Sequence, residues 1–459
     1  MDAADGLPPR QRRWAVLSLA VSIAIVVIDM AVANVALPTI ARDLGVTPSA
    51  SIWVVNAYQI AVTVSLLPLS ALGDIMGYRR IYLGGLAIFA IGAVVSASSD
   101  SLAMLVAARL AQGFGGGGVM SVNAALVRYV YPRSHLGRGI GLNSLIVASA
   151  SAAGPTVASA ILSVGPWPWL FALAAPLGLA AFVLAHRTIP AMAGSGHPFD
   201  LPSAGLSVVT VGLAVGAMDG VAHGNRAFAA GALAAAVACG WIFVRRQRGL
   251  AAPILAVDLF RRPLFSLSAA TAVLCYAAQA LGMVSLPFFL VEAAGRTQIE
   301  AGFLMTAWPI AIAAVAPISG RLADHWPVGL LCGVGLAAMA AGLLLLALLP
   351  PAPSTADIVW RMALCGLGFG FFQAPNNRAL LTSVPRERSG AAGGVLSSAR
   401  LIGQTCGAAL VAVAFGVAAA RPAMGHGATA AMLLGAAVAT AATLVSLSRL
   451  GRFAGSERL

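Results

Sequence analysis

The chain has 459 residues, of which 59% are hydrophobic and only 9% are charged. An average soluble domain carries about 25% charged residues, so this composition excludes a soluble multi-domain protein and indicates a membrane protein with many spans. The formal charge is +13, and the 28 basic residues are all arginine; because they lie beside apolar runs and form no basic face, we expect no nucleic-acid partner.

Apolar runs follow one another along the chain, each long enough to cross a bilayer as a helix of about 20 residues. The sequence therefore predicts an all-α polytopic membrane protein with fourteen spans. The first run follows several arginines, as in a signal peptide, but its length and the spans behind it favour an uncleaved helix. The expected spans lie near residues 14–38, 50–70, 80–98, 102–126, 138–163, 168–186, 203–220, 227–244, 265–291, 301–320, 328–349, 358–380, 391–417 and 428–447.

Arginine placement predicts the orientation of these spans. With the N-terminus in the cytoplasm, most arginines fall in inside segments and few fall in outside loops, as the positive-inside rule requires. Arg109 and Arg400 fall within spans instead. We therefore expect both termini in the cytoplasm and an even number of spans.

The spans group as six, two and six. This grouping predicts an N-terminal six-helix bundle (residues 1–190), an inserted two-helix hairpin with its linkers (191–262) and a C-terminal six-helix bundle (263–459). A weak repeat supports two related halves, because SALGD at residues 70–74 and GRLAD at residues 320–324 each follow the second span of a bundle. Related halves are common in transporters.

The loop after the second span reads ALGDIMGYRR (residues 71–80). It resembles the signature of the major facilitator superfamily at this place, Gly-x-Leu-x-Asp-x-x-Gly-x-x-Arg, with Ser70 in place of the first glycine. The resemblance implies the major facilitator fold and a latch that locks one end of the transport path. We expect a tight turn at the glycine and an ion pair between Asp74 and an arginine such as Arg138; an ordinary charged loop is the alternative. The predicted latch residues are Asp74, Gly77, Arg79, Arg80, Arg138 and Asp324.

Two charged residues lie deep in spans of the first half. Asp29 lies in VVIDMAVANVALP (26–38) and Arg109 lies in LVAARLAQGFGGGG (105–118), and a charge at that depth needs a partner or a water-filled cavity. Both stretches are similar to motifs of the fourteen-span drug:proton antiporters, a family of multidrug and quaternary-ammonium efflux type. The resemblance implies that Arg109 takes part in proton coupling, and we expect Asp29 to take part with it because it is the only carboxylate well inside a span. The alternative is that Arg109 only bonds carbonyls of a broken helix.

The fifth span contains Gly154 followed by Pro155. Proline removes a backbone hydrogen bond and bends a helix, and the stretch is similar to a degenerate form of the Gly-Pro motif of exporter subfamilies. We expect a helix-bending motif at Gly154 and Pro155, with a simple kink that has no antiport role as the alternative.

Polar and aromatic side chains inside spans are costly against lipid and so indicate a cavity. The candidate substrate-binding residues are Asp29, Asn34, Asn56, Tyr58, Gln279, Trp308, Gln373, Asn376, Asn377 and Arg400. The cysteines lie in apolar runs without the spacing of metal ligands, so we expect no metal site and no cofactor.

These observations predict a proton-coupled antiporter that exports lipophilic cationic or amphipathic compounds, as in multidrug efflux, from the cytoplasmic (inner) membrane of a bacterium. Burial favours the protonated form of Asp29, whereas a bound cation or Arg109 favours its anion. Proton and cation would then compete for one site while the two bundles alternate in access. We expect a monomer in the lipid bilayer, driven by the proton gradient, in which Asp29 itself is a cost to folding.

Two alternatives stay open. On the same fold, Arg109 and Arg400 would bind the carboxylate of an anionic metabolite, or the protein would carry a neutral one. The other class is a membrane-embedded enzyme or a non-transporting sensor. Against an enzyme, the chain has no HExxH, GxSxG or P-loop sequence and no large soluble domain.

Overall fold

The computed structural model describes residues 6–132, 135–192, 199–222, 224–248, 257–323, 325–350, 353–384, 389–420 and 427–453. Within these residues the regular structure is helical and no strand occurs. Fourteen helices in the described part are long and apolar enough to cross a membrane. This number confirms the predicted fourteen spans and the all-α class.

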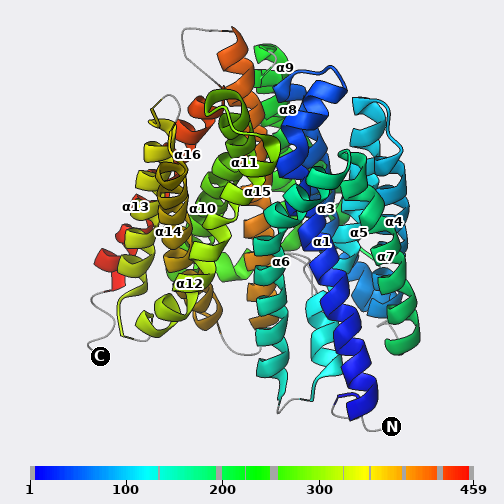
Figure 1. Cartoon of the computed structure of the whole chain (residues 1–459). Coiled ribbons are helices and arrows are strands. Elements are labelled where there is room, and N and C mark those ends of the chain that lie inside the picture. The colour runs from blue at the N-terminus through cyan, green and yellow to red at the C-terminus, as the bar shows by residue number, and fades with distance from the viewer. Residues whose placement is uncertain are drawn as a thin grey trace. The chain divides into compact units, whose positions relative to one another are not determined.

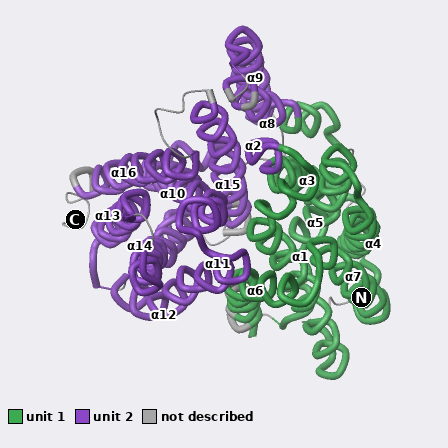
Figure 2. The backbone as a smooth tube through the Cα atoms, turned by 45° about the horizontal axis from the view of Figure 1, so that its top comes forward, with its two compact units in different colours: residues 1–46, 53–208 green, residues 47–52, 209–459 purple. Residues whose placement is uncertain are grey.

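The first compact unit comprises residues 1–46 and 53–208 (Figure 2). In this unit α5 packs between α3 and α4, α7 packs between α4 and α1, and α6 packs against α1. Its helices are α1 (Pro9–Asp43), α3 (Trp53–Met76), α4 (Tyr78–Ala97), α5 (Leu102–Val130), α6 (Leu136–Val164) and α7 (Pro168–Thr188) (Figure 1).

The second unit comprises residues 47–52 and 209–459 and repeats this packing order. Here α14 packs between α12 and α13, α16 packs between α13 and α10, and α15 packs against α10. The two halves therefore share one six-helix arrangement, as the sequence repeat indicates. Its elements are α2 (Pro48–Ser51), a 3-10 turn (Val257–Arg261), α10 (Pro263–Phe288), a π turn (Phe289–Ala293), α11 (Gln298–Met305), α12 (Ala307–Leu322), α13 (Val328–Ala347), α14 (Thr355–Thr382), α15 (Ser389–Ala420) and α16 (Gly427–Phe453).

Two further helices lie within the segment 191–262 for which the sequence predicts an inserted hairpin. They are α8 (Leu201–Ala222), which runs from the first unit into the second, and α9 (Arg226–Gln247), which belongs to the second unit. A Cβ added at Gly220 would press on Phe228 and Ala229, so the two helices pack closely where the hairpin turns. In the most apolar stretch of α8 only 28% is buried, and in that of α9 only 22% is buried. Most of both helices is therefore left to face lipid.

Glycines set the closest helix contacts in both units. A Cβ at Gly113 of α5 would clash with the Tyr58 carbonyl of α3, and one at Gly115 would clash with Phe89 of α4. In the second unit Gly366 of α14 approaches the Trp308 carbonyl of α12 in the same way. Small residues at such contacts let helix backbones approach in a membrane, so Gly113 and Gly115 hold the part of α5 that follows Arg109 against α3 and α4.

Two predicted spans contain a break between helices: residues 50–70, where α2 ends at Ser51 and α3 begins at Trp53, and residues 301–320. α11 ends at Met305 and α12 begins at Ala307. Pro309 cannot donate a backbone hydrogen bond to the Met305 carbonyl. At the break the Thr306 N–H donates to the Phe303 carbonyl at 3.1 Å, and the Thr306 hydroxyl donates to the Gly302 carbonyl at 3.3 Å. The two segments together still form one candidate span, Gln298–Leu322.

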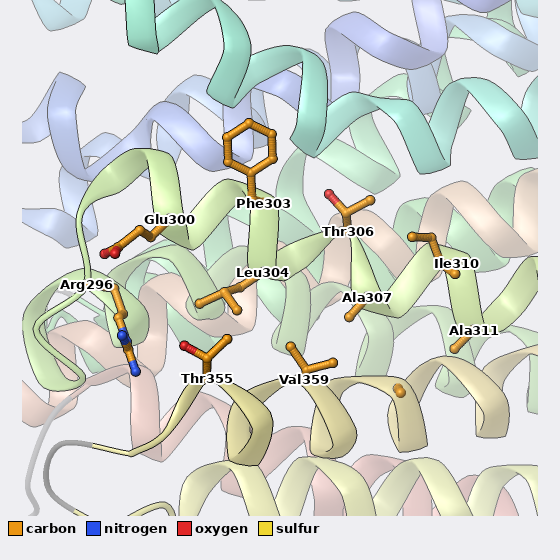
Figure 3. A pocket seen from close by; sticks show the side chains of 11 residues that line it. Arg296, Glu300, Phe303, Leu304, Thr306, Ala307, Ile310, Ala311, Thr355 and Val359 are labelled. Atoms are coloured by element: carbon orange, nitrogen blue, oxygen red, sulfur yellow. The ribbon is translucent and has the colours of Figure 1, made fainter.

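A cavity of about 690 Å³ opens in the second unit between α11, α12 and the start of α14. Arg296 and Glu300 lie at one end, and Ile310 and Ala311 lie at the other (Figure 3). None of the residues that the sequence singles out for substrate binding lines this cavity.

Candidate functional site

Asp29 and Arg109 form a buried ion pair in the first unit. The Arg109 Nη1 atom lies 2.6 Å from the Asp29 Oδ2 atom, and both side chains are only 1% exposed. The pair joins α1 to α5 across 80 positions of sequence. Arg109 therefore has the carboxylate partner that its depth requires, and the alternative in which it bonds only carbonyls is wrong.

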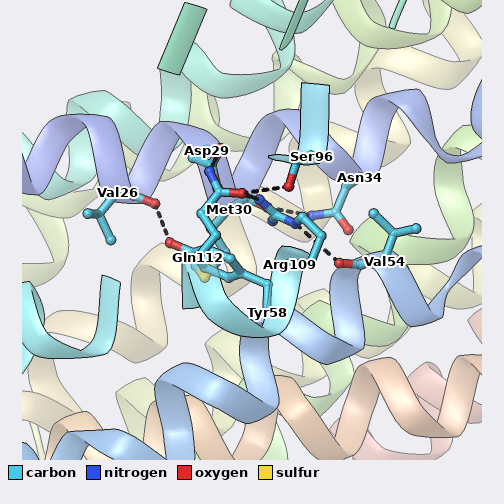
Figure 4. A network of polar contacts seen from close by, with 9 residues as sticks. All are labelled: Val26, Asp29, Met30, Asn34, Val54, Tyr58, Ser96, Arg109 and Gln112. Carbon is cyan, nitrogen blue, oxygen red and sulfur yellow. Dashed lines mark hydrogen bonds and ion pairs between the residues drawn. The ribbon is translucent and has the colours of Figure 1, made fainter. Parts of the chain in front are cut away.

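Gln112 completes this pair, and the sequence analysis assigned it no role. It lies one helical turn beyond Arg109, and its Nε2 atom donates to the Asp29 Oδ1 atom at 2.9 Å (Figure 4). Its Oε1 atom accepts from Arg109 Nη1 at 2.8 Å and from the Ser96 hydroxyl at 3.3 Å. Its i+3 spacing from a mid-span arginine was the available signal, since such residues share a helix face.

Other groups fix the guanidinium in place. The Arg109 Nε atom donates to the Val54 carbonyl at 3.3 Å. The guanidinium carbon lies 4.2 Å from the centre of the Tyr58 ring and 5.2 Å from that of Phe171. Tyr58 in turn donates its hydroxyl to the Val26 carbonyl at 3.3 Å (Figure 4). Helices α1, α3, α4, α5 and α7 thus enclose one polar network, and its two opposite charges balance.

The ion pair reverses one sequence-based expectation. Asp29 taken alone is a cost to folding, but it supplies the counter-charge of a fully buried arginine. Removing one partner of a buried pair leaves an uncompensated charge and typically costs about 3–5 kcal/mol. We therefore expect that loss of Asp29 destabilises the protein.

The predicted helix-bending motif lies directly beside this network. Gly154 and Pro155 lie inside α6, which continues from Leu136 to Val164. A Cβ at Gly154 would clash with the Cβ of Ala31, two residues beyond Asp29. Gly154 therefore allows α6 to lie against α1 at the level of the ion pair.

The predicted latch is partly described. Gly77 has a φ of 93° and precedes α4, so it makes the tight turn that the sequence predicts. Asp74 accepts a hydrogen bond from the Tyr78 hydroxyl at 2.6 Å, and Arg79 donates to the His186 carbonyl at 2.6 Å. Arg80 is exposed. Asp324 and the side chain of Arg138, the expected partner of Asp74, lie outside the described residues.

A second buried arginine, Arg449 of α16, lies just beyond the last expected span, residues 428–447. It is 3% exposed and donates to neutral oxygens of Ser268, Thr271, Asn376 and Ser446 at 3.0–3.2 Å. Asn376 also donates to the Ser268 carbonyl at 3.1 Å. Both ends of this candidate substrate-binding residue are thus engaged in joining α10, α14 and α16.

The remaining candidates lie in both units. Asn34 donates to the Met30 carbonyl at 3.4 Å, and its Oδ1 atom has no partner among the described residues. Asn56 is 1% exposed, with its Oδ1 atom likewise without a described partner. Trp308 is 1% exposed and its ring lies against Gly282. Gln373 donates to the Tyr276 hydroxyl at 3.4 Å.

Comparison with known proteins places this site in a family context. Residues 19–408 match the sequence model of the Major Facilitator Superfamily. An uncharacterized transporter, YebQ of Escherichia coli (strain K12), is 53% identical over 413 residues, which are 89% of this chain and 90% of that protein.

Two further relatives carry names that state what they transport or export. The riboflavin transporter RibZ of Clostridioides difficile (strain 630) is 28% identical over 402 residues, 87% of each chain. The multidrug efflux pump LfrA of Mycolicibacterium smegmatis is 31% identical over 414 residues, 88% of this chain and 81% of that protein.

Proposed function

Because the chain belongs to the major facilitator superfamily, we propose that it exports amphipathic small molecules across a bacterial cytoplasmic membrane in exchange for protons. The observation that carries this proposal is the closed network of Asp29, Arg109 and Gln112. Ionisable residues inside membrane spans are rare and mark ion and proton pathways. A monomer with both termini in the cytoplasm is part of the same proposal.

Protonation of Asp29 would change the packing of the first unit. In the paired state the carboxylate neutralises Arg109, and almost none of either side chain is exposed. A neutral Asp29 leaves the guanidinium with Gln112, the Val54 carbonyl and two aromatic faces, which compensate its charge poorly. A conformation that admits water to Arg109 then becomes more favourable, so proton binding shifts the population of conformations.

The substrate class follows from charge and from the relatives. A lipophilic cation requires an acid that can face it, whereas Asp29 faces Arg109 in this state. The efflux pump LfrA and the riboflavin transporter RibZ differ in what their names say they carry. Amphipathic compounds are the class that we propose, and organic cations are one member of it to be tested.

Transport by purified protein in proteoliposomes with an imposed pH gradient tests the proposal. Cationic, neutral and anionic fluorescent amphiphiles are compared in the wild type and in Asp29→Asn. We expect Asp29→Asn to lose uptake driven by the pH gradient while it keeps substrate–substrate exchange, which shows that the variant is folded. Asp357→Asn, which removes a carboxylate of a partly exposed ion pair, is the matched control and should keep both activities. Undiminished proton-driven transport by Asp29→Asn would overturn the proposal.

A further inference from the structure

The second unit contains a mid-span arginine whose donors are not engaged. Arg400 lies in α15 within the candidate span Ala392–Ala419 and is partly exposed. Among the described residues it forms no ion pair, since the described pairs join Asp29 to Arg109 and Asp357 to Arg361. No described residue accepts a hydrogen bond from it either.

Comparison with the other two buried arginines sharpens this contrast. Arg109 donates to Asp29, Gln112 and the Val54 carbonyl, and the four terminal contacts of Arg449 go to neutral oxygens. The terminal nitrogens of both guanidinium groups therefore bond protein partners, and only the Nε atom of Arg449 has no partner among the described residues. Of these three arginines, Arg400 is the one with its donors available in the described part of the chain.

Polar side chains accompany Arg400 on three helices. On each helix two of them lie one turn apart and thus share a face. The pairs are Tyr276 and Gln279 on α10, Gln373 and Asn377 on α14, and Arg400 and Gln404 on α15.

Two contacts bring these faces together at Tyr276. Gln373 donates its Nε2 atom to the Tyr276 hydroxyl at 3.4 Å. Gly403, three residues beyond Arg400, packs on the Tyr276 side chain and holds α15 against α10 at this level. The cluster therefore combines one cation with several neutral polar groups.

The cluster is accessible and incompletely bonded. All its members except Tyr276 are partly exposed, although they lie within helices of the membrane-spanning part. The Oε1 atoms of Gln279 and Gln404 and the Oδ1 atom of Asn377 are themselves buried and have no partner among the described residues. Such groups are costly in lipid and are found facing cavities or one another, so this face of the second unit is suited to a ligand.

We propose that Arg400, supported by Tyr276 and Gln373, binds an anionic group of the transported compound, so that the preferred substrates are aromatic amphiphiles carrying a carboxylate. A guanidinium recognises a carboxylate through two parallel hydrogen bonds, which gives both energy and orientation. The amide groups of Gln279 and Gln404 would bond neighbouring polar atoms of the same molecule. This inference rests on the proposed transport function and assigns its substrate class.

Direct binding to purified wild-type protein in detergent tests the inference without any pH gradient. The probes share one ring system and differ in charge: 1-naphthaleneacetate, its neutral amide, and 1-naphthylmethyl-trimethylammonium. We expect the carboxylate to bind at least about tenfold tighter than the cation, since one charge-assisted contact of this kind is typically worth a tenfold or larger change in affinity. Binding of all three probes with equal affinity, or no binding of the carboxylate, would overturn the inference.

Variants assign the preference to Arg400. Arg400→Gln should lose about tenfold in affinity for the carboxylate and keep its affinity for the amide, which also reports that the variant is folded. Arg400→Lys should keep much of the preference for the carboxylate. The matched control Arg321→Gln removes an exposed charge at the end of α12 and should change nothing. An Arg400→Gln variant that binds the carboxylate as the wild type does would refute the assignment.

This test separates the two proposals. Carboxylate binding that depends on Arg400, together with proton-driven transport by Asp29→Asn, would leave the recognition site standing and remove the coupling mechanism. The opposite pair of results would keep the coupling mechanism and remove the assigned substrate class.

Discussion

The buried ion pair makes a quantitative prediction about stability. Asp29→Asn keeps the shape of the side chain and leaves Arg109 charged and buried, whereas Arg109→Gln leaves a buried carboxylate. Each single change should cost about 3 kcal/mol, because one partner of a buried pair is left uncompensated. The double variant removes both charges, so it should cost about 2 kcal/mol less than the sum of the two single changes.

The free energy of unfolding is measured in mixed micelles by titration with sodium dodecyl sulfate. The wild type, the two single variants and the double variant together give the double-mutant cycle. The ion pair of Asp357 and Arg361 is the matched control. The Arg361 Nη2 atom lies 3.2 Å from the Asp357 Oδ1 atom, and the side chains of Asp357 and Arg361 are 32% and 13% exposed. Exposed pairs at i,i+4 spacing contribute about 0.3–0.5 kcal/mol. The control cycle, with Asp357→Asn and Arg361→Gln, should therefore give a coupling of that small size.

Two results would contradict this reasoning. A coupling energy at Asp29 and Arg109 no larger than that of the control cycle would mean that the two charges are separated or solvated in the membrane protein. A stabilising Asp29→Asn substitution would restore the simpler view that the carboxylate is only a cost, and would show that Gln112 and the aromatic rings compensate Arg109 without it.

Two glycine substitutions test the packing and the turn that position this network. Gly113→Ala should lower the free energy of unfolding by about 1–3 kcal/mol, because its Cβ would clash with the Tyr58 carbonyl. As the control, a Cβ at Gly231 would have no atom within 4 Å, so Gly231→Ala should be neutral or stabilising in the same micelle titration. Gly77→Ala should cost about 1–3 kcal/mol, because the residue has a φ of 93° and a ψ of 133°, a conformation that residues with a side chain rarely adopt. Gly84→Ala, which has open space and lies inside α4, should not destabilise.

The fold was largely predictable from the sequence because a bilayer permits few kinds of spanning structure and sets the length of each helix. Apolar run length and arginine placement predicted fourteen spans, and the structure contains fourteen suitable helices in its described part. The break between α11 and α12 was not predicted. Its cause is local, since Pro309 lacks the donor that would continue the helix, while hydropathy stays high across the break.

The site was predictable only residue by residue. Asp29 and Arg109 each stood out as a charge in an apolar run, but their pairing across 80 positions is a tertiary contact that a single sequence does not encode locally. Gln112 lies in the same motif as Arg109, but it was given no role because an amide one turn from an arginine is common on helix surfaces. Arg449 was missed because it lies at the end of its span, where an arginine usually reaches water, whereas here neighbouring hydroxyl and amide oxygens bury it.

The two mid-span arginines of the candidate sites differ in a way that bears on how coupling would work. Arg109 is neutralised by the acid beside it, so proton binding changes the charge of the first unit. Arg400 has no described acid beside it, so a carboxylate-bearing substrate changes the charge of the second unit. If the two proposals hold together, proton and substrate bind at different places and do not compete directly for Asp29. Each then acts by stabilising a different conformation of one transporter, and exchange follows because a ligand shifts a conformational equilibrium only by its difference in affinity for the two states.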